Sequence, residues 1–132
     1  MCIRDRARGQ VGLIVTGGIS PNKEGVVAMG GATLMTEAEA DHHKVITDAV
    51  HEADGKICLQ ILHTGRYAYS KELVAPSPIK APINMMTPRE LTSDDVKRTI
   101  QDYVRCATLA KSAGYDGVEV MGSEGYLSLI HI

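Results

Sequence analysis

The chain has 132 residues, of which 44% are hydrophobic and 23% are charged, and its formal net charge is -2 at pH 7. This length and composition are typical of one globular domain and exclude disordered, collagen-like and highly charged tail proteins. The nearly balanced charge and the lack of Trp and Phe argue against a nucleic-acid partner, and no apolar run approaches the roughly 18 residues needed to span a membrane.

The beginning of the chain and its cysteines bear on where the protein works. The N-terminus lacks the apolar stretch of a signal peptide. Cys2, Cys58 and Cys106 are too few and too scattered for a disulfide framework or for a zinc site with CxxC spacing. We therefore expect a cytoplasmic protein with reduced thiols, no metal site, and a small molecule as its partner.

The two ends of the chain are related through their coding DNA. Residues 1–6 (MCIRDR) can be back-translated to a DNA sequence whose reverse complement encodes LSLIHI, which is residues 127–132. One short DNA element in opposite orientations would produce both hexapeptides, and it resembles a transposon-type library adapter. We therefore expect residues 1–6 and 127–132 to be non-native tails, and residues 7–126 to be a fragment of a longer protein.

The first predicted elements are a strand and a helix. Residues 11–16 (VGLIVT) form an apolar, β-branched run that ends in two glycines, which is the pattern of a buried strand followed by a tight turn. After a Gly-rich connection, Thr36 and Glu39 form a T-x-x-E capping box that predicts the start of a helix, with Gly55 at its C-terminal cap. The apolar residues that recur there at helical spacing are Val45, Ile46, Ala49, Val50 and Ala53.

The second half of the chain repeats the alternation. Residues 56–63 (KICLQILH) predict a second buried strand, and the prolines in residues 64–91 predict a long irregular loop. Thr92 with Asp95 predicts the start of a second helix, and residues 117–121 (GVEVM) predict a third strand. The residues expected on the apolar side of this helix are Val96, Ile100, Tyr103, Val104, Ala107 and Ala110.

The order strand, helix, strand, helix, strand predicts an α/β fold with three parallel strands. Both faces of a parallel sheet must be covered, and two helices cannot do this alone. Two complete folds contain such a unit, namely a doubly wound sheet and a (β/α)₈ barrel. In both of them the functional residues lie at the C-terminal ends of the strands.

The glycines after the first strand and the glutamine in the second invite two interpretations each. Gly17 and Gly18 do not fit a GxGxxG dinucleotide-binding motif, and they either let a planar ligand approach the backbone or permit a positive φ, of which we favour the latter. Gln60 interrupts an apolar run with an uncharged amide. This amide matches the alternating donors and acceptors of a flavin pyrimidine edge, or it bonds to a neighbouring strand inside a barrel.

Other polar residues follow the second and third strands. His63 and Arg66 are candidates for hydrogen bonds or positive charge toward an anionic ligand, or for ion pairs within the loop. Tyr126 has a phenol that can act as a general acid, with Glu124 as a possible polar neighbour. The three histidines near the first helix, which match no metal motif, are expected to form a surface cluster; they are His42, His43 and His51.

Three segments carry a resemblance to a known family. They are LQILHTGRYAY (residues 59–69), LVAPSPIKAPIN (73–84) and AGYDGVEVMGSEGY (113–126), preceded by LIVTGGISPN near the N-terminus. In this order and spacing they resemble the old yellow enzyme family of NADH:flavin oxidoreductases, and within it the bacterial FMN-dependent 2,4-dienoyl-CoA reductases.

The resemblance implies a fold and three site residues. It implies a partial (β/α)₈ TIM barrel in which the three predicted strands are barrel strands 2 to 4. It also implies that Gly18 approaches the FMN, that Gln60 hydrogen-bonds its pyrimidine edge, and that Tyr126 donates a proton to the substrate. Many relatives carry an HGAHGY-like motif after the fourth strand, whereas Met121 and Glu124 occupy its two substrate-binding positions here, as in the dienoyl-CoA reductases.

The implied reaction is the reduction of a conjugated acyl-CoA thioester by hydride from reduced FMN. In the full-length parent, the resemblance further implies FAD, a 4Fe-4S cluster and NADPH as the electron donor. The parts of the family that bind these groups and the FMN phosphate are absent from this chain, so we expect it to be inactive alone. Two other interpretations stay open: a flavin-dependent enone reductase of the same family, and a non-catalytic α/β module.

Overall fold

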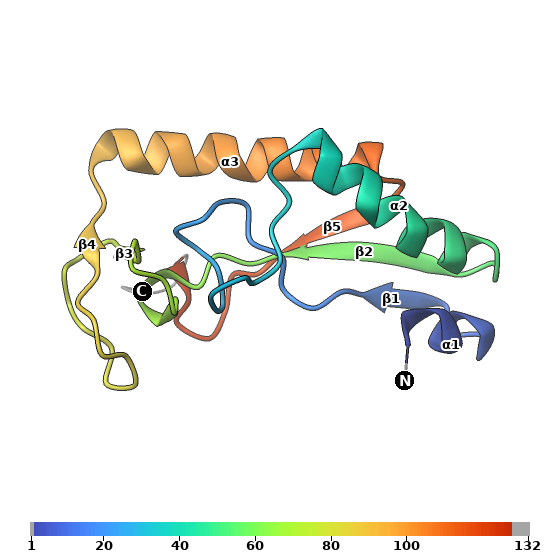
Figure 1. Cartoon of the computed structure of the whole chain (residues 1–132), viewed down its shortest axis with the longest axis horizontal. Coiled ribbons are helices and arrows are strands. Elements are labelled where there is room, and N and C mark those ends of the chain that lie inside the picture. The colour runs from blue at the N-terminus through green and yellow to red at the C-terminus, as the bar shows by residue number, and fades with distance from the viewer. Residues whose placement is uncertain (1, 128–132) are drawn as a thin grey trace.

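The structure, a computed structural model, describes residues 2–127 and shows the predicted βαβαβ order (Figure 1). Its main elements are α1 (Ile3–Arg8), β1 (Leu13–Val15), α2 (Glu37–His51), β2 (Lys56–Ile61), α3 (Ser93–Ser112) and β5 (Gly117–Val120). The 3₁₀ helix η1 (Gly65–Tyr67) and the short strands β3 (Val74–Ala75) and β4 (Arg89–Glu90) lie between β2 and α3.

Both predicted capping boxes are present. Thr36 Oγ1 accepts a hydrogen bond from the Glu39 amide at 3.3 Å, and the Glu39 carboxylate accepts one from the Thr36 amide at 3.0 Å. At α3, Thr92 Oγ1 accepts from the Asp95 amide at 3.1 Å, and the Asp95 carboxylate accepts from the Thr92 amide at 2.9 Å. The sequence therefore specifies where both long helices begin, because each box satisfies amides that have no partner inside the helix.

The end of α2 differs from the prediction. The C-cap is Glu52, and the left-handed residue of the following turn is Asp54, with φ 57°, and not Gly55. Asp tolerates this conformation because its short polar side chain can bond locally. Gly55 lies in a tightly packed place, because a Cβ there would lie 3.0 Å from Val50 Cγ1.

The segment 64–91 is more regular than predicted. It contains η1 and β3, and β3 pairs in parallel with β4 through Val74 with Arg89 and Ala75 with Glu90. The prolines lie outside these three elements, so they limit the length of the pairing without preventing it; they are Pro76, Pro78, Pro82 and Pro88.

The main sheet has the order β1-β2-β5, with both pairs parallel. The strand order follows the chain without a reversal, and α2 and α3 lie on the same face of the sheet (Figure 1). A barrel wall carries its helices on one face and has such an order. Each half of a doubly wound sheet does so too, because the order of that fold reverses only between its halves. The arrangement is therefore consistent with part of a barrel wall, and the three strands alone do not distinguish the two folds.

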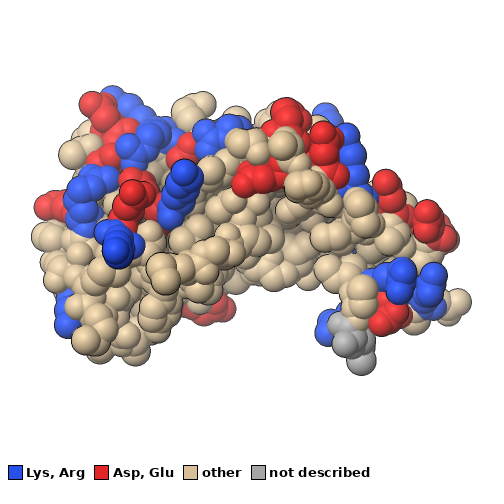
Figure 2. Space-filling view, viewed as in Figure 1, with Lys and Arg blue, Asp and Glu red and all other residues tan. Residues whose placement is uncertain are grey.

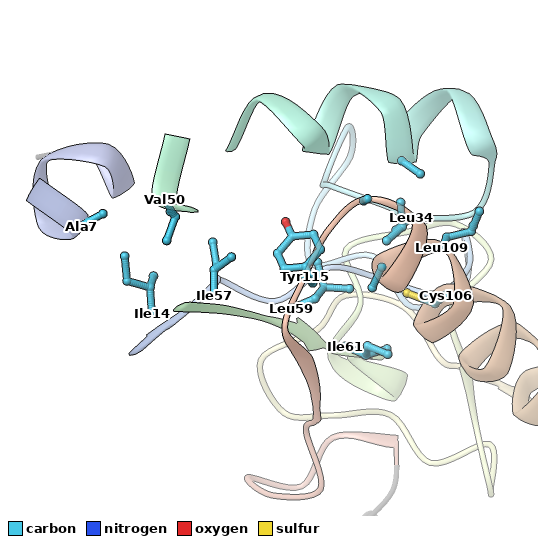
Figure 3. Close-up of a cluster of buried hydrophobic side chains, with 13 residues drawn as sticks. Ala7, Ile14, Leu34, Val50, Ile57, Leu59, Ile61, Cys106, Leu109 and Tyr115 are labelled. Atoms are coloured by element: carbon cyan, nitrogen blue, oxygen red, sulfur yellow. The ribbon is translucent and has the colours of Figure 1, made fainter. Parts of the chain in front are cut away.

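The core lies between this sheet and its two covering helices (Figure 3). Alternate side chains of β2 supply its centre, since Ile57, Leu59 and Ile61 are all fully buried. Cys106 of α3 is buried beside them, and burial raises the pKa of its thiol to about 12, so it is a packing residue. The buried cluster consists of Ala7, Ile14, Leu34, Ala40, Val50, Ile57, Leu59, Ile61, Cys106, Leu109, Ala110, Ala113 and Tyr115.

The structure describes most of the first predicted tail but only the first residue of the second. The expected boundary after residue 6 falls inside α1, whose Ala7 is buried and whose Ile3 packs against the core. Of the second hexapeptide, residues 128–132 lie outside the described part of the chain. The assignment of both hexapeptides as non-native stays a prediction.

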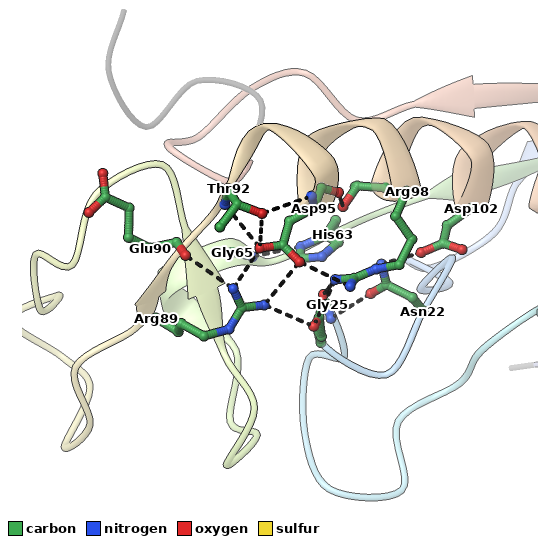
Figure 4. Close-up of polar contacts among 12 residues, drawn as sticks. Asn22, Gly25, His63, Gly65, Arg89, Glu90, Thr92, Asp95, Arg98 and Asp102 are labelled. Atoms are coloured by element: carbon green, nitrogen blue, oxygen red, sulfur yellow. Dashed lines mark hydrogen bonds and ion pairs between the residues drawn. The ribbon is translucent and has the colours of Figure 1, made fainter.

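Several apolar residues of the predicted helices and strands are exposed. Those on the helices are Val45, Val96, Ile100 and Val104, and those on the strands are Leu13, Val15, Val118 and Val120. The N-terminal half of α3 buries Asp95, Thr99 and Asp102 instead. This half covers the loop after β1 and the end of β4, to which it is joined by hydrogen bonds and ion pairs (Figure 4).

Charged side chains gather along α3 and α2 on the side shown in Figure 2. One ion-pair group joins Glu24 to Arg89 and Arg98, with N–O distances of 3.4 and 2.9 Å. Within residues 2–127, no helix combines the length and the apolar character that crossing a membrane requires.

Truncation of Leu59 tests the core. Leu59→Ala leaves a cavity at the centre of β2, and we expect the free energy of unfolding to fall by about 2–5 kcal/mol. Val45→Ala is the control, because Val45 is 75% exposed and its change should stay within about 0.5 kcal/mol. Denaturant unfolding followed by circular dichroism measures both, and equal losses in the two variants would contradict the described core.

Acid should weaken the start of α3. The Arg89 guanidinium, followed by the amide and hydroxyl of Thr92, holds the pKa of Asp95 well below its usual range. A carboxyl whose pKa is lower in the folded state stabilises the fold above its unfolded pKa of about 4, and this stabilisation is lost as the pH falls.

We therefore expect Asp95→Asn to lower the free energy of unfolding at pH 7 and to reduce the difference between pH 7 and pH 3. Asp94→Asn makes the same chemical change on the same helix, where the side chain is 91% exposed, and should leave the difference unchanged. Identical pH profiles for the two variants would refute the assignment.

Candidate functional site

The C-terminal ends of β1, β2 and β5 lie at one edge of the sheet (Figure 1). Beyond the strands, the Ile19 amide donates to the Gln60 carbonyl and the Leu62 amide donates to the Ile19 carbonyl, both at 2.9 Å. The Met121 amide likewise donates to the Ile61 carbonyl at 3.0 Å. The three connecting segments that follow therefore start side by side, at the edge where parallel α/β folds carry their functional residues.

Gln60 lies on the face of the sheet opposite the helices. Its neighbours Leu59 and Ile61 are buried against the helices, and Gln60 alternates with them. Its Nε2 donates to Glu119 Oε2 at 2.9 Å, across from it in the strand register. This is the bond to a neighbouring strand that was one of the two interpretations of Gln60. Among the described residues it is the only hydrogen bond of the amide, which keeps one N–H and its carbonyl oxygen for a ligand.

Gly17 and Gly18 are not turn glycines, and the favoured positive-φ interpretation was wrong. Neither is among the residues with positive φ. A Cβ on Gly18 would collide with Leu62, lying 2.8 Å from its Cβ, whereas a Cβ on Gly17 would meet nothing within 4 Å. Gly18 is therefore required by packing against the segment after β2, and Gly17 borders open space.

Tyr126 lines a hollow of about 290 Å³ at this edge, together with Glu124 and Tyr67. The rings of Tyr126 and Tyr67 meet edge to face, with centroids 6.0 Å apart at 85°. Glu124 and Gly125 adopt positive φ of 62° and 70°, which turns the chain sharply before Tyr126. The other lining residues are Val27, Thr64, Tyr69 and Ile83.

His63, a candidate for contact with an anionic ligand or for an ion pair within the loop, is buried. It is 1% exposed, and its Nδ1 accepts a hydrogen bond from the Gly65 amide at 3.2 Å. Burial lowers its pKa to about 4, so the ring is neutral near pH 7. Its Nε2 has no hydrogen-bond partner among the described residues. The ring packs beside Gly25, where a Cβ would lie 2.6 Å from His63 Cδ2.

Arg66 contacts an aromatic ring. Its guanidinium carbon lies 5.3 Å from the centroid of the Tyr67 ring, and its Nη2 donates to the Tyr67 hydroxyl at 3.3 Å. Arg66 thereby helps to hold Tyr67, which in turn contacts Tyr126.

The histidines near α2 do not converge. His43 Nδ1 is 3.0 Å from the Tyr115 hydroxyl, and His51 Nε2 is 2.9 Å from Asp116 Oδ2. Burial lowers the pKa of His43. Within the described part of the chain, no three His, Cys, Asp or Glu side chains are placed to hold a metal ion.

Two residues of this edge were not singled out from the sequence. Glu119 interrupts the apolar run of the third strand just as Gln60 interrupts that of the second, and this shared interruption was a usable signal. Tyr67 carried no such signal, because its contact with Tyr126 depends on how the loops fold. The structure joins Gln60 to Glu119 by a hydrogen bond and places Tyr126 and Glu124 around one hollow. Among the described residues, Gly18 and Gln60 do not line that hollow.

Comparison with known proteins identifies relatives of this chain. It is 39% identical over 132 residues to a metal reductase of Desulforamulus reducens, which covers 94% of this chain and 19% of that protein. It is 34% identical over 123 residues to an NADPH dehydrogenase of a Geobacillus species, covering 92% of this chain and 36% of the relative.

A solved structure is also similar to this chain. The old yellow enzyme homologue from Zymomonas mobilis superposes with a TM-score of 0.85 at 30% identity, over 95% of this chain and 39% of that one. The chain therefore spans between 19% and 39% of the length of these relatives. Residues 2–130 match the family model described as the NADH:flavin oxidoreductase / NADH oxidase family, and the chain belongs to that family.

Proposed function

We propose that this chain forms part of an FMN-dependent NAD(P)H oxidoreductase that reduces conjugated C=C bonds of 2,4-dienoyl-CoA thioesters. One observation carries the proposal: the amide of Gln60 and the hollow containing Tyr126 lie at the same edge of a parallel sheet. Membership in the flavin oxidoreductase family supports it. We also keep the assignment of the three main strands as barrel strands 2 to 4 as part of this proposal.

The residues at the edge fit a flavin. Its pyrimidine ring presents alternating donors and acceptors, and Gln60 keeps both an N–H and a carbonyl oxygen beside its bond to Glu119. Gly17 leaves open space next to the backbone, while the Cβ side of Gly18 is filled by Leu62. A contact from Gly18 to the cofactor would therefore use its backbone. When bound, FMN supplies the hydride.

Tyr126 holds the proton that the reaction needs at its hydroxyl oxygen. A phenol hydroxyl can donate its proton to one carbon of a C=C bond when the other carbon receives a hydride. The edge-to-face contact with Tyr67 restricts the Tyr126 ring, which limits the directions in which its hydroxyl can point. Aliphatic Val27 and Ile83 line the same hollow and suit an acyl chain.

The proposed substrate and electron donors come from the resemblance in sequence. Glu124 lines the hollow, at a position where many relatives carry the second histidine of an HGAHGY-like motif. This departure favours an acyl-CoA substrate over a simple enone. We further propose NADPH as the donor, with FAD and a 4Fe-4S cluster in a longer parent. The low share of the metal reductase that the chain spans, 19%, is compatible with such additional parts.

A second candidate is a flavin-dependent enone reductase of the same family. The match to an NADPH dehydrogenase, of which the chain spans a larger share of 36%, favours it. Both candidates use a flavin cofactor. They differ in the substrate that accepts the hydride, which is a dienoyl-CoA thioester in the first and an enone in the second.

One experiment tests the proposed function. The gene product that contains this chain is purified at its natural length, and hydride transfer is compared between a 2,4-dienoyl-CoA and a cyclic enone. We expect flavin absorbance and a preference for the thioester. Tyr126→Phe should lower turnover by about 10²- to 10⁴-fold while leaving the flavin content unchanged, because only the proton donor is lost.

Tyr69→Phe is the matched control, since Tyr69 lines the same hollow and is 56% exposed. If the protein prefers the cyclic enone, the second candidate function replaces the first. A protein without flavin would refute both candidates.

A substitution at Gly18 separates packing from cofactor binding. We expect Gly18→Ala to lower the free energy of unfolding by about 1–3 kcal/mol, because its Cβ collides with Leu62. Gly17→Ala should leave stability within about 0.5 kcal/mol. Thermal denaturation measures both variants, and equal stability of Gly18→Ala and Gly17→Ala would contradict the packing explanation.

A further inference from the structure

A buried hydrogen bond joins α3 to the loop that follows β1, and the proposed mechanism does not use it. Asn22 Nδ2 donates to Asp102 Oδ2 at 2.9 Å, and the two residues are 8% and 6% exposed (Figure 4). Asp102 also forms an ion pair with Arg105 at 2.9 Å. The carboxylate therefore has partners on two sides, as a buried charge requires.

Asn22 also organises the loop around itself. Its Oδ1 accepts from the Gly25 amide at 3.0 Å, and its backbone carbonyl accepts from the Ser20 hydroxyl at 2.6 Å. Arg105 Nη2 donates to the Pro21 carbonyl at 3.1 Å. One side-chain amide thus closes the turn at residues 22–25 and ties this turn to the helix.

The loop is fixed on its other side by the segment after β2. The amide and the hydroxyl of Thr64 both donate to the Gly25 carbonyl, at 3.1 and 2.9 Å. The buried ring of His63 packs against Gly25. At the start of the loop, Ile19 pairs with the backbone of Gln60 and Leu62. Asn22 therefore lies near the middle of residues 18–25. This segment begins at Gly18, beside the candidate cofactor site, and ends at Gly25, which contacts Thr64 and His63.

We propose that Asn22 and Asp102 form a positioning pair that fixes residues 18–25 relative to Gln60, and so sets the backbone edge that the flavin meets. This inference rests on the proposed function and adds residues that act on the cofactor through the backbone without touching it. Stability alone is a weak reason for the pair, because apolar side chains of similar volume stabilise a core as well as a buried charged group does. A buried polar pair whose hydrogen bonds are all made holds the two segments that carry it in one definite arrangement.

Three variants test the pair. Asn22→Asp places two carboxylates against each other, and Asn22→Ala removes the amide without adding a charge. Asn22→Asp combined with Asp102→Asn exchanges donor and acceptor and restores a hydrogen bond. Asp94→Asn is the control, because it makes the same change as Asp102→Asn at an exposed position of α3.

Three readouts are measured, one without cofactor and two with it. In the 132-residue chain, amide hydrogen exchange of Gly25 reports whether the loop is held. In the flavin-containing gene product, FMN titration gives the dissociation constant, and visible circular dichroism reports the flavin's surroundings. We expect both single substitutions at Asn22 to speed exchange at Gly25, to raise the dissociation constant about tenfold or more and to alter the flavin spectrum. The exchanged pair should return all three toward wild type.

The outcomes separate this inference from the proposed function. If the wild-type protein binds flavin and Asn22→Ala binds it as Asp94→Asn does, the positioning role is refuted and the proposed function stands. The same holds if the exchanged pair regains slow exchange at Gly25 without regaining flavin affinity. If the wild-type protein binds no flavin, the proposed function and the positioning role both fail.

Discussion

The alternation of side chains along β2 is the constraint on which the rest of the structure depends. This strand is paired in parallel on both sides, so its backbone cannot shift by one residue without breaking two ladders. The fixed register sends Leu59 and Ile61 toward the helices and Gln60 to the opposite face. It also places Gln60 across from Glu119, and it aligns the ends of all three strands. The core therefore packs against one face of β2, and Gln60 of the candidate site lies on the other face.

Most of the fold could be predicted from the sequence because its signals are local. The capping boxes at Thr36 and Thr92 act within three residues, and the apolar runs mark the strands directly. The inward side of α3 could be predicted only in part. Tyr103, Ala107 and Ala110 pack in or against the core as expected, whereas Val96, Ile100 and Val104 are exposed. The inward face of the first half is polar instead and is satisfied by partners distant in sequence, such as Asn22 for Asp102.

The residues of the candidate site also divide into those that local sequence signals predict and those that depend on distant contacts. Gln60 stood out because an amide in an apolar run is conspicuous, and Tyr126 because it follows a strand in a Gly-rich turn. The packing role of Gly18 and the burial of His63 could not be read from the sequence, since each depends on a neighbour from another segment. The family resemblance correctly identified the flavin oxidoreductases, whereas it could not reveal which side of Gly18 is already occupied.

The exposed apolar side of α3 has a consequence for handling the chain in solution. Val96, Ile100 and Val104 form a strip on a helix whose opposite side is polar and buried. Apolar strips of this kind associate more strongly in salts that are excluded from protein surfaces, such as sulfate and phosphate. Concentrated sulfate or phosphate therefore raises the free-energy cost of leaving this strip in contact with water.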